Sequence, residues 1–243
     1  MSTGNLDLAL GCFYGVGVGP GDPELLTLKA SRLLQRVPVV SVARPEPGQD
    51  HYALSVVREL LDDTRQEILQ LPLPSDAATA DGAAQVWRAA VDAIGERLQM
   101  GQDVAFITEG DPMLYSAFSQ LLEYVQSGYP EAPVEVIPGV SSVMAAAASA
   151  GVPLVTHGQR LAILPAVYGI DDLREAITNY DTIVLMEVNR ALLDALANLE
   201  KLGLAGKAFY VRRATTQREE VVQDIHQLSA EDLDYFSLLI IKR

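Results

Sequence analysis

The sequence predicts an α/β fold with two α/β domains. The N-terminal domain is expected to contain a mainly parallel sheet with flanking helices, and the C-terminal domain a mixed sheet. Over the first 140 residues, short apolar runs alternate with segments of helical periodicity, which is typical of parallel strands covered by helices. Near the end, two strand-like runs follow one another, which favours antiparallel pairing. Hydrophobic residues make up 49% of the 243 residues, enough for buried cores. We place the domains approximately at 1–140 and 141–243.

The first domain begins with an apolar strand over Cys12–Val18 and a helix over Glu24–Gln35. Pro23 suits the first helical position, where no N–H donor is needed. The segment Ala83–Met100 is an amphipathic helix, and Gly101 follows it as a C-cap. The other elements expected here are strands at 37–42, 67–71, 103–108 and 133–137 and helices at 52–61 and 114–127.

The second domain is expected to open with an Ala-rich, packed helix within Gly139–Val155. Mixed pairing is expected because Glu219–Gln223 and Tyr235–Ile241 are both strand-like. The other elements expected here are strands at 160–164, 182–187 and 207–211 and helices at 170–179 and 189–202.

Charge and composition exclude several function classes. The net charge is −14, with no basic run, so we expect no nucleic-acid partner. No apolar run approaches the roughly 20 residues of a membrane span, and no signal peptide is visible, so a cytoplasmic protein without a membrane partner is expected. The single cysteine, Cys12, and the scattered His51, His157 and His226 have no usual metal-ligand spacing, so no metal site is expected.

The glycine-rich turn Gly15–Pro23 follows the first strand and opens the first helix. A dinucleotide fingerprint requires G-x-G-x-x-G, but counting from Gly15 or Gly17 puts Pro20 or Asp22 at the third glycine position. No Gly-Lys-Ser/Thr follows, as a phosphate loop requires. Two interpretations remain: a tight strand–helix connection, or glycines that let the backbone approach a ligand.

A second distinctive loop, Glu109–Ser116, follows the strand at 103–108. Gly110 would let the backbone approach a ligand. Asp111 could accept hydrogen bonds from that ligand, or it could cap a helix beginning at Pro112, because Asp is a favoured N-cap and Pro a favoured first residue. Both roles are compatible.

A third loop, Pro138–Ser142, joins a strand to the Ala-rich helix. Ser141 or Ser142 would either cap this helix or direct its hydroxyl at a ligand. Ligands bind at the carboxyl ends of parallel strands, where all three loops are expected. No Ser, His and Asp residues stand at triad-like positions.

Together these loops resemble the tetrapyrrole (class III) methyltransferases. The resemblance lies in GVGPGDPELLT at 17–27, EGDPMLYS at 109–116 and IPGVSS at 137–142, in their order and spacing, and it extends over essentially the whole chain. Segments 110–116, 213–216 and 235–241 are most similar to the branch that methylates carbon 20 of precorrin-2 in corrin synthesis.

The resemblance implies S-adenosylmethionine bound in a cleft between the domains, with S-adenosylhomocysteine as product. The residues that it implies for cofactor binding are Pro20, Gly110, Asp111, Met113, Leu114, Tyr115, Ser116, Ser141, Ser142, Met186, Ala214 and Ser237.

It also implies a tetrapyrrole substrate with many carboxylates and direct displacement at the sulfonium methyl group. Tyr115 and Asp22 are the candidate catalytic residues; Glu109 lies on the same loops, and water is an alternative proton acceptor. The candidates for binding substrate carboxylates are Arg44, Arg160 and Arg213, because arginine can pair with carboxylates in a bidentate manner. A homodimer is a further expectation.

Two positions reverse the charge that the family commonly has. Glu187 stands where lysine is common, and Arg212 stands where glutamate is frequent, so one hypothesis is a swapped ion pair. Alternatives for the function are methylation of another tetrapyrrole carbon, diphthamide formation, or a non-catalytic nucleotide-binding module. Whether cobalt is already in the substrate ring stays open.

Overall fold

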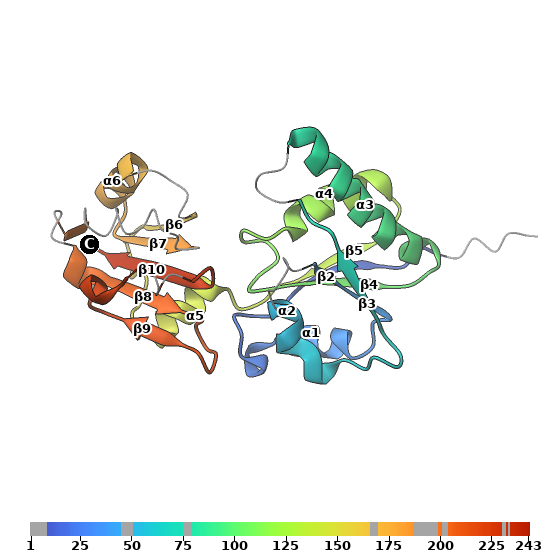
Figure 1. The fold of residues 1–243 in the computed structure, drawn as a ribbon, viewed down its shortest axis with the longest axis horizontal. Helices are drawn as coiled ribbons and strands as arrows, with labels where there is room; N and C mark the ends of the chain where they lie inside the picture. The colour runs from blue at the N-terminus through green and yellow to red at the C-terminus, as the bar shows by residue number, and fades with distance from the viewer. Residues whose placement is uncertain are drawn as a thin grey trace, which may run out of the picture. The chain divides into compact units, whose positions relative to one another are not determined.

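The computed structural model describes residues 9–44, 51–74, 79–165, 170–186, 199–200, 204–229, 232 and 234–243. The chain divides into two compact units, Met1–Ser141 and Ser142–Arg243. Each unit contains one five-stranded sheet (Figure 1). Most of the helix expected over 189–202 lies outside the described residues. Within the described part of the chain, no helix combines the length and apolar character needed to cross a membrane.

The sheet of the N-terminal unit is entirely parallel. Its strand order is β3-β2-β4-β1-β5, so β4, β1 and β5 are direct neighbours. The strands are β1 (Phe13–Gly17), β2 (Val39–Ala43), β3 (Glu67–Leu71), β4 (Val104–Thr108) and β5 (Val134–Ile137).

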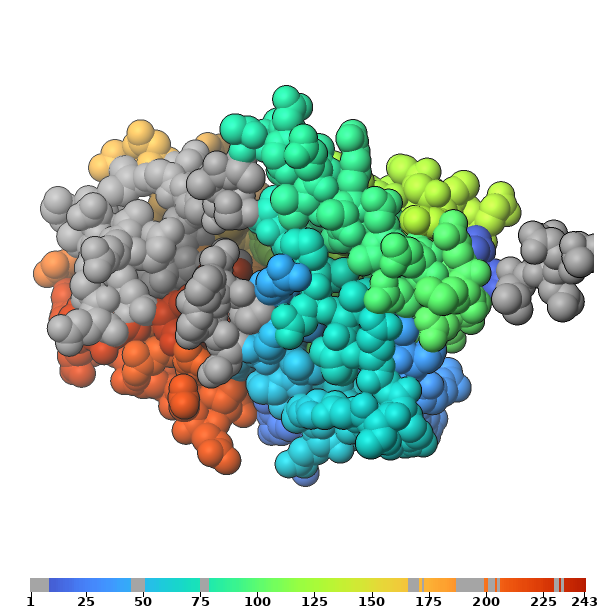
Figure 2. Space-filling model, turned by 45° about the vertical axis from the view of Figure 1, so that its right-hand side comes forward, coloured from blue at the N-terminus to red at the C-terminus, as the bar shows by residue number. Residues whose placement is uncertain are grey.

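Helices cover both faces of this sheet. They are α1 (Leu28–Leu34), α2 (Tyr52–Val57), α3 (Ala80–Gln99) and α4 (Phe118–Gly128), with short 3-10 helices at Pro23–Leu25 and Arg58–Leu60. Because successive strand residues point to opposite faces, Val104 and Phe106 pack with α3 and α4, whereas Ala105 and Ile107 pack with α1 and α2. Figure 2 shows α3 and α4 side by side on the surface. The result is a three-layer α/β/α unit.

The sheet of the C-terminal unit is mixed, in the order β6-β7-β10-β8-β9. The strands β6 (Leu161–Pro165) and β7 (Thr182–Met186) are parallel to each other, and the pairs involving β8 (Ala208–Arg212), β9 (Glu220–Val222) and β10 (Ser237–Lys242) are antiparallel. Helix α5 (Ser142–Ser149) contacts β8 and β10, and α6 (Ile170–Asn179) contacts β7. Short 3-10 helices occupy Ala205–Lys207 and Ile225–Gln227. The predicted fold class, with one parallel and one mixed sheet, is confirmed.

Several predicted helices have different bounds in the structure, and three of the differences have a visible local feature. The helix expected over 24–35 is interrupted, because Thr27 starts α1 anew by accepting a hydrogen bond from the Ala30 N–H at 3.1 Å. The helix expected from Leu114 begins only at Phe118, since the preceding residues form a turn. The helix expected within 139–155 is confined to α5 and ends before Pro153.

Candidate functional site

The three distinctive loops lie together at one edge of the N-terminal sheet. They follow β1, β4 and β5, which are adjacent and parallel, so their carboxyl ends meet. The first two loops also pair directly: the Gly110 N–H donates to the Gly19 carbonyl at 2.8 Å, and the Gly19 N–H donates to the Gly110 carbonyl at 3.3 Å. Segments about 90 residues apart in sequence thus form one continuous structure.

Glycine is required where these loops meet. A Cβ atom at Gly17 would lie 2.5 Å from the Gly110 carbonyl oxygen, and one at Gly139 would lie 2.1 Å from the same atom. Both distances are far below van der Waals contact. At Gly17 and Gly139 the missing Cβ therefore makes room for the backbone of the neighbouring loop.

Asp111 fastens the second loop to the third. Its Oδ1 accepts a hydrogen bond from the Met113 N–H at 2.9 Å, and its Oδ2 accepts one from the Gly139 N–H at 3.0 Å. The expected helix at Pro112 is absent, so Asp111 caps a turn rather than a helix. Because each carboxylate oxygen accepts from a backbone amide, Asp111 holds the second and third loops together.

The turn that follows presents apolar side chains to solvent. Met113 is 59% exposed and Tyr115 is 53% exposed, whereas Leu114 is partly buried. Tyr115 has a φ of +50°, a left-handed conformation that costs a non-glycine residue about 1–2 kcal/mol. The Ser116 hydroxyl lies 3.0 Å from that of Thr108 and accepts a hydrogen bond from the Phe118 N–H at 3.2 Å. Ser116 therefore anchors the strained turn to the end of β4 and the start of α4.

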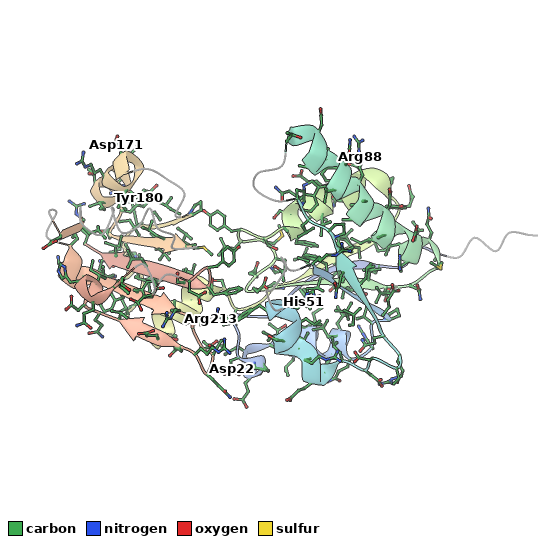
Figure 3. All side chains as sticks on the ribbon, viewed as in Figure 1. Asp22, His51, Arg88, Asp171, Tyr180 and Arg213 are labelled. Carbon is green, nitrogen blue, oxygen red and sulfur yellow. The ribbon has the colours of Figure 1, made fainter. Side chains whose placement is uncertain are left out.

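The first loop is held by two further contacts. The Asp22 carboxylate accepts a hydrogen bond from the Glu24 N–H at 2.9 Å and caps the 3-10 helix that begins at Pro23. The buried Pro20 offers its carbonyl to the Tyr52 hydroxyl at 2.8 Å. Figure 3 labels Asp22 on this loop and His51 at the start of α2.

Glu109 connects the second loop to α2. Its Oε1 accepts a hydrogen bond from the Ala53 N–H at 3.2 Å. The side chain remains accessible to solvent, yet surrounding protein desolvates the carboxylate and raises its pKa above the ordinary glutamate value; its own amide and that of Ala53 lower it in part. Sequence reasoning placed Glu109 in the second motif and beside Asp22 and Tyr115 on the loops where a proton acceptor could lie, but it did not identify Tyr52 or Ala53. The available signal was the position of Glu109 directly after a buried strand.

The two serines of the third loop fall on either side of the division between the units. Ser141 is the last residue of the first unit, and Ser142 begins α5 in the second. Both are partly buried. They follow Gly139, whose amide is fixed by Asp111.

In the C-terminal unit, three cofactor candidates share one sheet edge. Met186 ends β7 opposite Leu238, and Ser237 begins β10 opposite Arg212, two residues before Ala214. Ser237 is 2% exposed, and its hydroxyl donates to the Asp234 carbonyl. The hydroxyl of Ser237 thus supports the local backbone, and Ala214 is likewise buried.

The three arginine candidates have different surroundings. Arg44 follows β2 at the carboxyl edge of the parallel sheet, with an exposed side chain. Arg213 has a φ of +47°; its Nε lies 2.7 Å from Asp234 Oδ2, and its guanidinium lies over the Phe236 ring. Arg160 precedes β6 beside the start of β7, at the sheet edge opposite Met186. The structure does not bring Arg160 together with the other candidates of its unit.

Arg212 forms an ion pair with Glu220 across the β8–β9 pair, and its Nη1 donates to the Asp232 carbonyl. Glu187, the other half of the hypothetical swapped pair, lies outside the described residues. Among the residues described, no three His, Cys, Asp or Glu side chains are grouped as a metal ion would require.

Comparisons with known proteins agree with this arrangement. The family model for tetrapyrrole (corrin/porphyrin) methylases matches residues 12–228. The cobalt-precorrin-2 C(20)-methyltransferase of Salmonella typhimurium is 32% identical over 96% of this chain and 97% of its own length. The precorrin-2 C(20)-methyltransferase of a Sinorhizobium species is 30% identical over 96% of each chain.

A solved structure of a tetrapyrrole methyltransferase is also similar to this chain. The uroporphyrin-III C-methyltransferase of Thermus thermophilus, in complex with S-adenosylhomocysteine, has a TM-score of 0.68 and 27% identity, covering 96% of this chain and 92% of that one. The matched fold, the full-length relatives and the three loops lead to one conclusion: the chain belongs to the tetrapyrrole methylase family.

Proposed function

We propose that this chain is an S-adenosylmethionine-dependent enzyme that methylates carbon 20 of precorrin-2, or of its cobalt-containing form, in cobalamin biosynthesis. The observation that carries the proposal is the interlocked set of loops after β4, β1 and β5, in a chain that matches relatives with this activity along nearly its whole length. The nucleotide-binding module is disfavoured, because the dinucleotide fingerprint is absent.

The loop residues fit this cofactor. Adenosine and methionine need apolar surface and backbone hydrogen-bonding groups rather than fixed charges, and the turn at Met113–Tyr115 offers exposed apolar side chains on a backbone anchored by Asp111. When bound, S-adenosylmethionine supplies a methyl group activated by its sulfonium. We assign it to Pro20, Gly110–Ser116, Ser141 and Ser142, with Met186 and the backbone near Ala214 and Ser237 from the second unit.

The chain contributes mainly by positioning. Holding two reactants in a productive orientation can lower a barrier by about 7–11 kcal/mol. The hydrogen bonds of Asp111, Ser116 and Tyr52 fix the loops before any ligand arrives, so little ordering remains for the bound state. Arg44 is exposed at the same sheet edge and is proposed to pair with a substrate carboxylate. Arg213 contributes by ordering its turn through Asp234.

Incubation with precorrin-2 and methyl-labelled S-adenosylmethionine tests the proposal. We expect one added methyl group by mass spectrometry and a carbon-13 signal at carbon 20 by NMR. Label at another ring carbon would replace the proposed position by the alternative within the family, and absence of transfer to any tetrapyrrole would reject the function. Parallel assays with cobalt-loaded and metal-free substrate decide between the two forms named for the relatives.

The homodimer expected from the resemblance belongs to the same proposal. Light scattering coupled to size-exclusion chromatography should give twice the chain mass of 26.2 kDa. A monomer mass at assay concentrations would remove this part and leave the activity proposal unchanged.

A further inference from the structure

The proposed reaction requires a proton acceptor. The substrate carbon forms a bond to the methyl carbon while the bond from that carbon to sulfur breaks, and the electron pair stays on sulfur. The hydrogen at the substrate carbon must then leave as a proton, with its bonding pair returning to the ring π system. A group that accepts this proton has to lie at the loop cluster and hold an available oxygen or nitrogen lone pair.

Two of the acidic side chains on the loops are already engaged with backbone amides. Asp111 uses one oxygen for Met113 and the other for Gly139. Asp22 accepts from the Glu24 N–H and caps a 3-10 helix. Tyr115 carries a phenol, whose O–H is a hydrogen-bond donor. These hydrogen bonds give Asp111 and Asp22 positioning roles.

Glu109 has the properties that the others lack. It directly follows β4, and among the residues that the structure describes, Ala53 of α2 is the only other residue that engages its carboxylate, through its N–H to Oε1. That hydrogen bond fixes the side chain, while the residue as a whole stays exposed. We propose that Glu109, through Oε2, is the catalytic residue that accepts the proton released from the methylated carbon.

The electrostatics of Glu109 support this role. Desolvation by the surrounding protein raises its pKa, which makes the carboxylate a stronger base than an ordinary glutamate. Two titratable residues adjoin its partner Ala53 in the chain: His51, the N-cap of α2, and Tyr52. The His51 Nδ1 is buried without a hydrogen-bond partner among the described residues, and the Tyr52 hydroxyl donates to Pro20. Burial is the largest cause and raises the pKa, whereas the backbone amides of Glu109 and Ala53 lower it in part.

This inference rests on the proposed function, and the decisive variant is Glu109→Gln. The amide oxygen of glutamine can still accept from Ala53, but it cannot take up the proton. Under single-turnover conditions we expect product formation to slow about 10²-fold or more. With substrate deuterated at the reacting carbon, the ratio of protium to deuterium rates should rise above that of the unmodified protein, because proton loss becomes rate-limiting. Glu109→Asp, which keeps a carboxylate, should recover part of the rate.

The matched control is Glu123→Gln on α4, an exposed residue outside the motif loops, which should leave rate and isotope effect unchanged. Calorimetric titration with S-adenosylhomocysteine checks that Glu109→Gln still folds and binds. A Glu109→Gln protein that binds normally and turns over within about twofold of the unmodified protein, with the same isotope effect, would overturn the proposal.

A second measurement separates this inference from the proposed function. Carbon-13 NMR of the carboxyl groups, without cofactor or substrate, should give one glutamate with a raised titration midpoint that disappears in Glu109→Gln. An ordinary midpoint for Glu109 would overturn the inference even where methylation occurs. Failure of the unmodified protein to methylate any tetrapyrrole would instead reject the proposed function.

Discussion

At the scale of single residues, the three loop carboxylates differ in how far they reach. The short side chains of Asp22 and Asp111 each accept a hydrogen bond from the amide two residues further along the chain, a geometry typical of Asp in turns. Asp111 also accepts one from the Gly139 amide of the third loop. Glu109, one methylene longer, reaches an amide 56 positions away. Both aspartates therefore hold the backbone of the loops, whereas Glu109 connects a loop to helix α2.

Glu109 should also make the stability of the protein depend on pH. Its pKa is raised in the folded state, so the folded protein binds this proton more tightly than the unfolded chain does. Stability is therefore lost as pH rises from the ordinary glutamate pKa to the raised one. We expect Glu109→Gln to be more stable than the unmodified protein at neutral pH, with the difference vanishing towards pH 4.

Urea denaturation across this pH range measures the effect. The same series with Glu123→Gln serves as the control, since that side chain is exposed. A Glu109→Gln protein that is less stable at neutral pH would show that the carboxylate stabilises the fold.

At the scale of elements, the glycines where the loops cross predict whether a substitution raises or lowers the stability of the fold. Gly139→Ala places a Cβ 2.1 Å from the Gly110 carbonyl, so two loop backbones must separate. We expect a loss of about 3 kcal/mol in the free energy of unfolding and weaker binding of S-adenosylhomocysteine. Gly206→Ala is the matched control, because no atom of the described residues lies within 4 Å of the added Cβ. If Gly139→Ala and Gly206→Ala were equally stable in chemical denaturation, the close contact between the Gly110 and Gly139 backbones would be contradicted.

The two ends of β2 offer a test of substrate binding. Arg44 follows the strand at the carboxyl edge, and the exposed Arg36 precedes it at the other edge. Loss of one charged hydrogen bond costs about 1.5 kcal/mol, so Arg44→Ala should raise the KM for the tetrapyrrole about tenfold without changing that for the cofactor. Arg36→Ala should change neither. Steady-state kinetics with both substrates varied would reject this assignment if the two variants behaved alike.

The spacing of apolar residues predicted an element well where one apolar face alone determines its bounds. The strand at Glu67–Leu71 and the helix at Ile170–Asn179 have the expected bounds. Helix α4 begins at Phe118, four residues after the predicted start, because Tyr115 takes a left-handed backbone conformation. Sequence rules expect that conformation at Gly or Asn, not at tyrosine. The helix start at Thr27 was likewise missed, because the apolar residues keep their helical spacing through it.

At the scale of the whole molecule, the motif loops could be identified from sequence but their supports could not. Their spacing and residue types pointed to the family, which the comparisons establish. The contacts Tyr52–Pro20 and Ala53–Glu109 join positions 32 and 56 residues apart, through a helix with no distinctive motif. Such pairs depend on strand order, since β2 and β4 must be neighbours before α2 can meet the end of β4.

The division into two units makes cofactor binding visible in thermal unfolding. Units with separate cores can unfold in separate transitions, so a single two-state analysis need not hold. S-Adenosylhomocysteine at about 100 times its Kd should stabilise whatever it binds by about 2.7 kcal/mol. If residues of both units hold the cofactor, as we propose, calorimetry should show both transitions moving upward together. A shift of the N-terminal transition alone would confine the cofactor to the loops after β1, β4 and β5 and remove Met186, Ala214 and Ser237 from the proposed site.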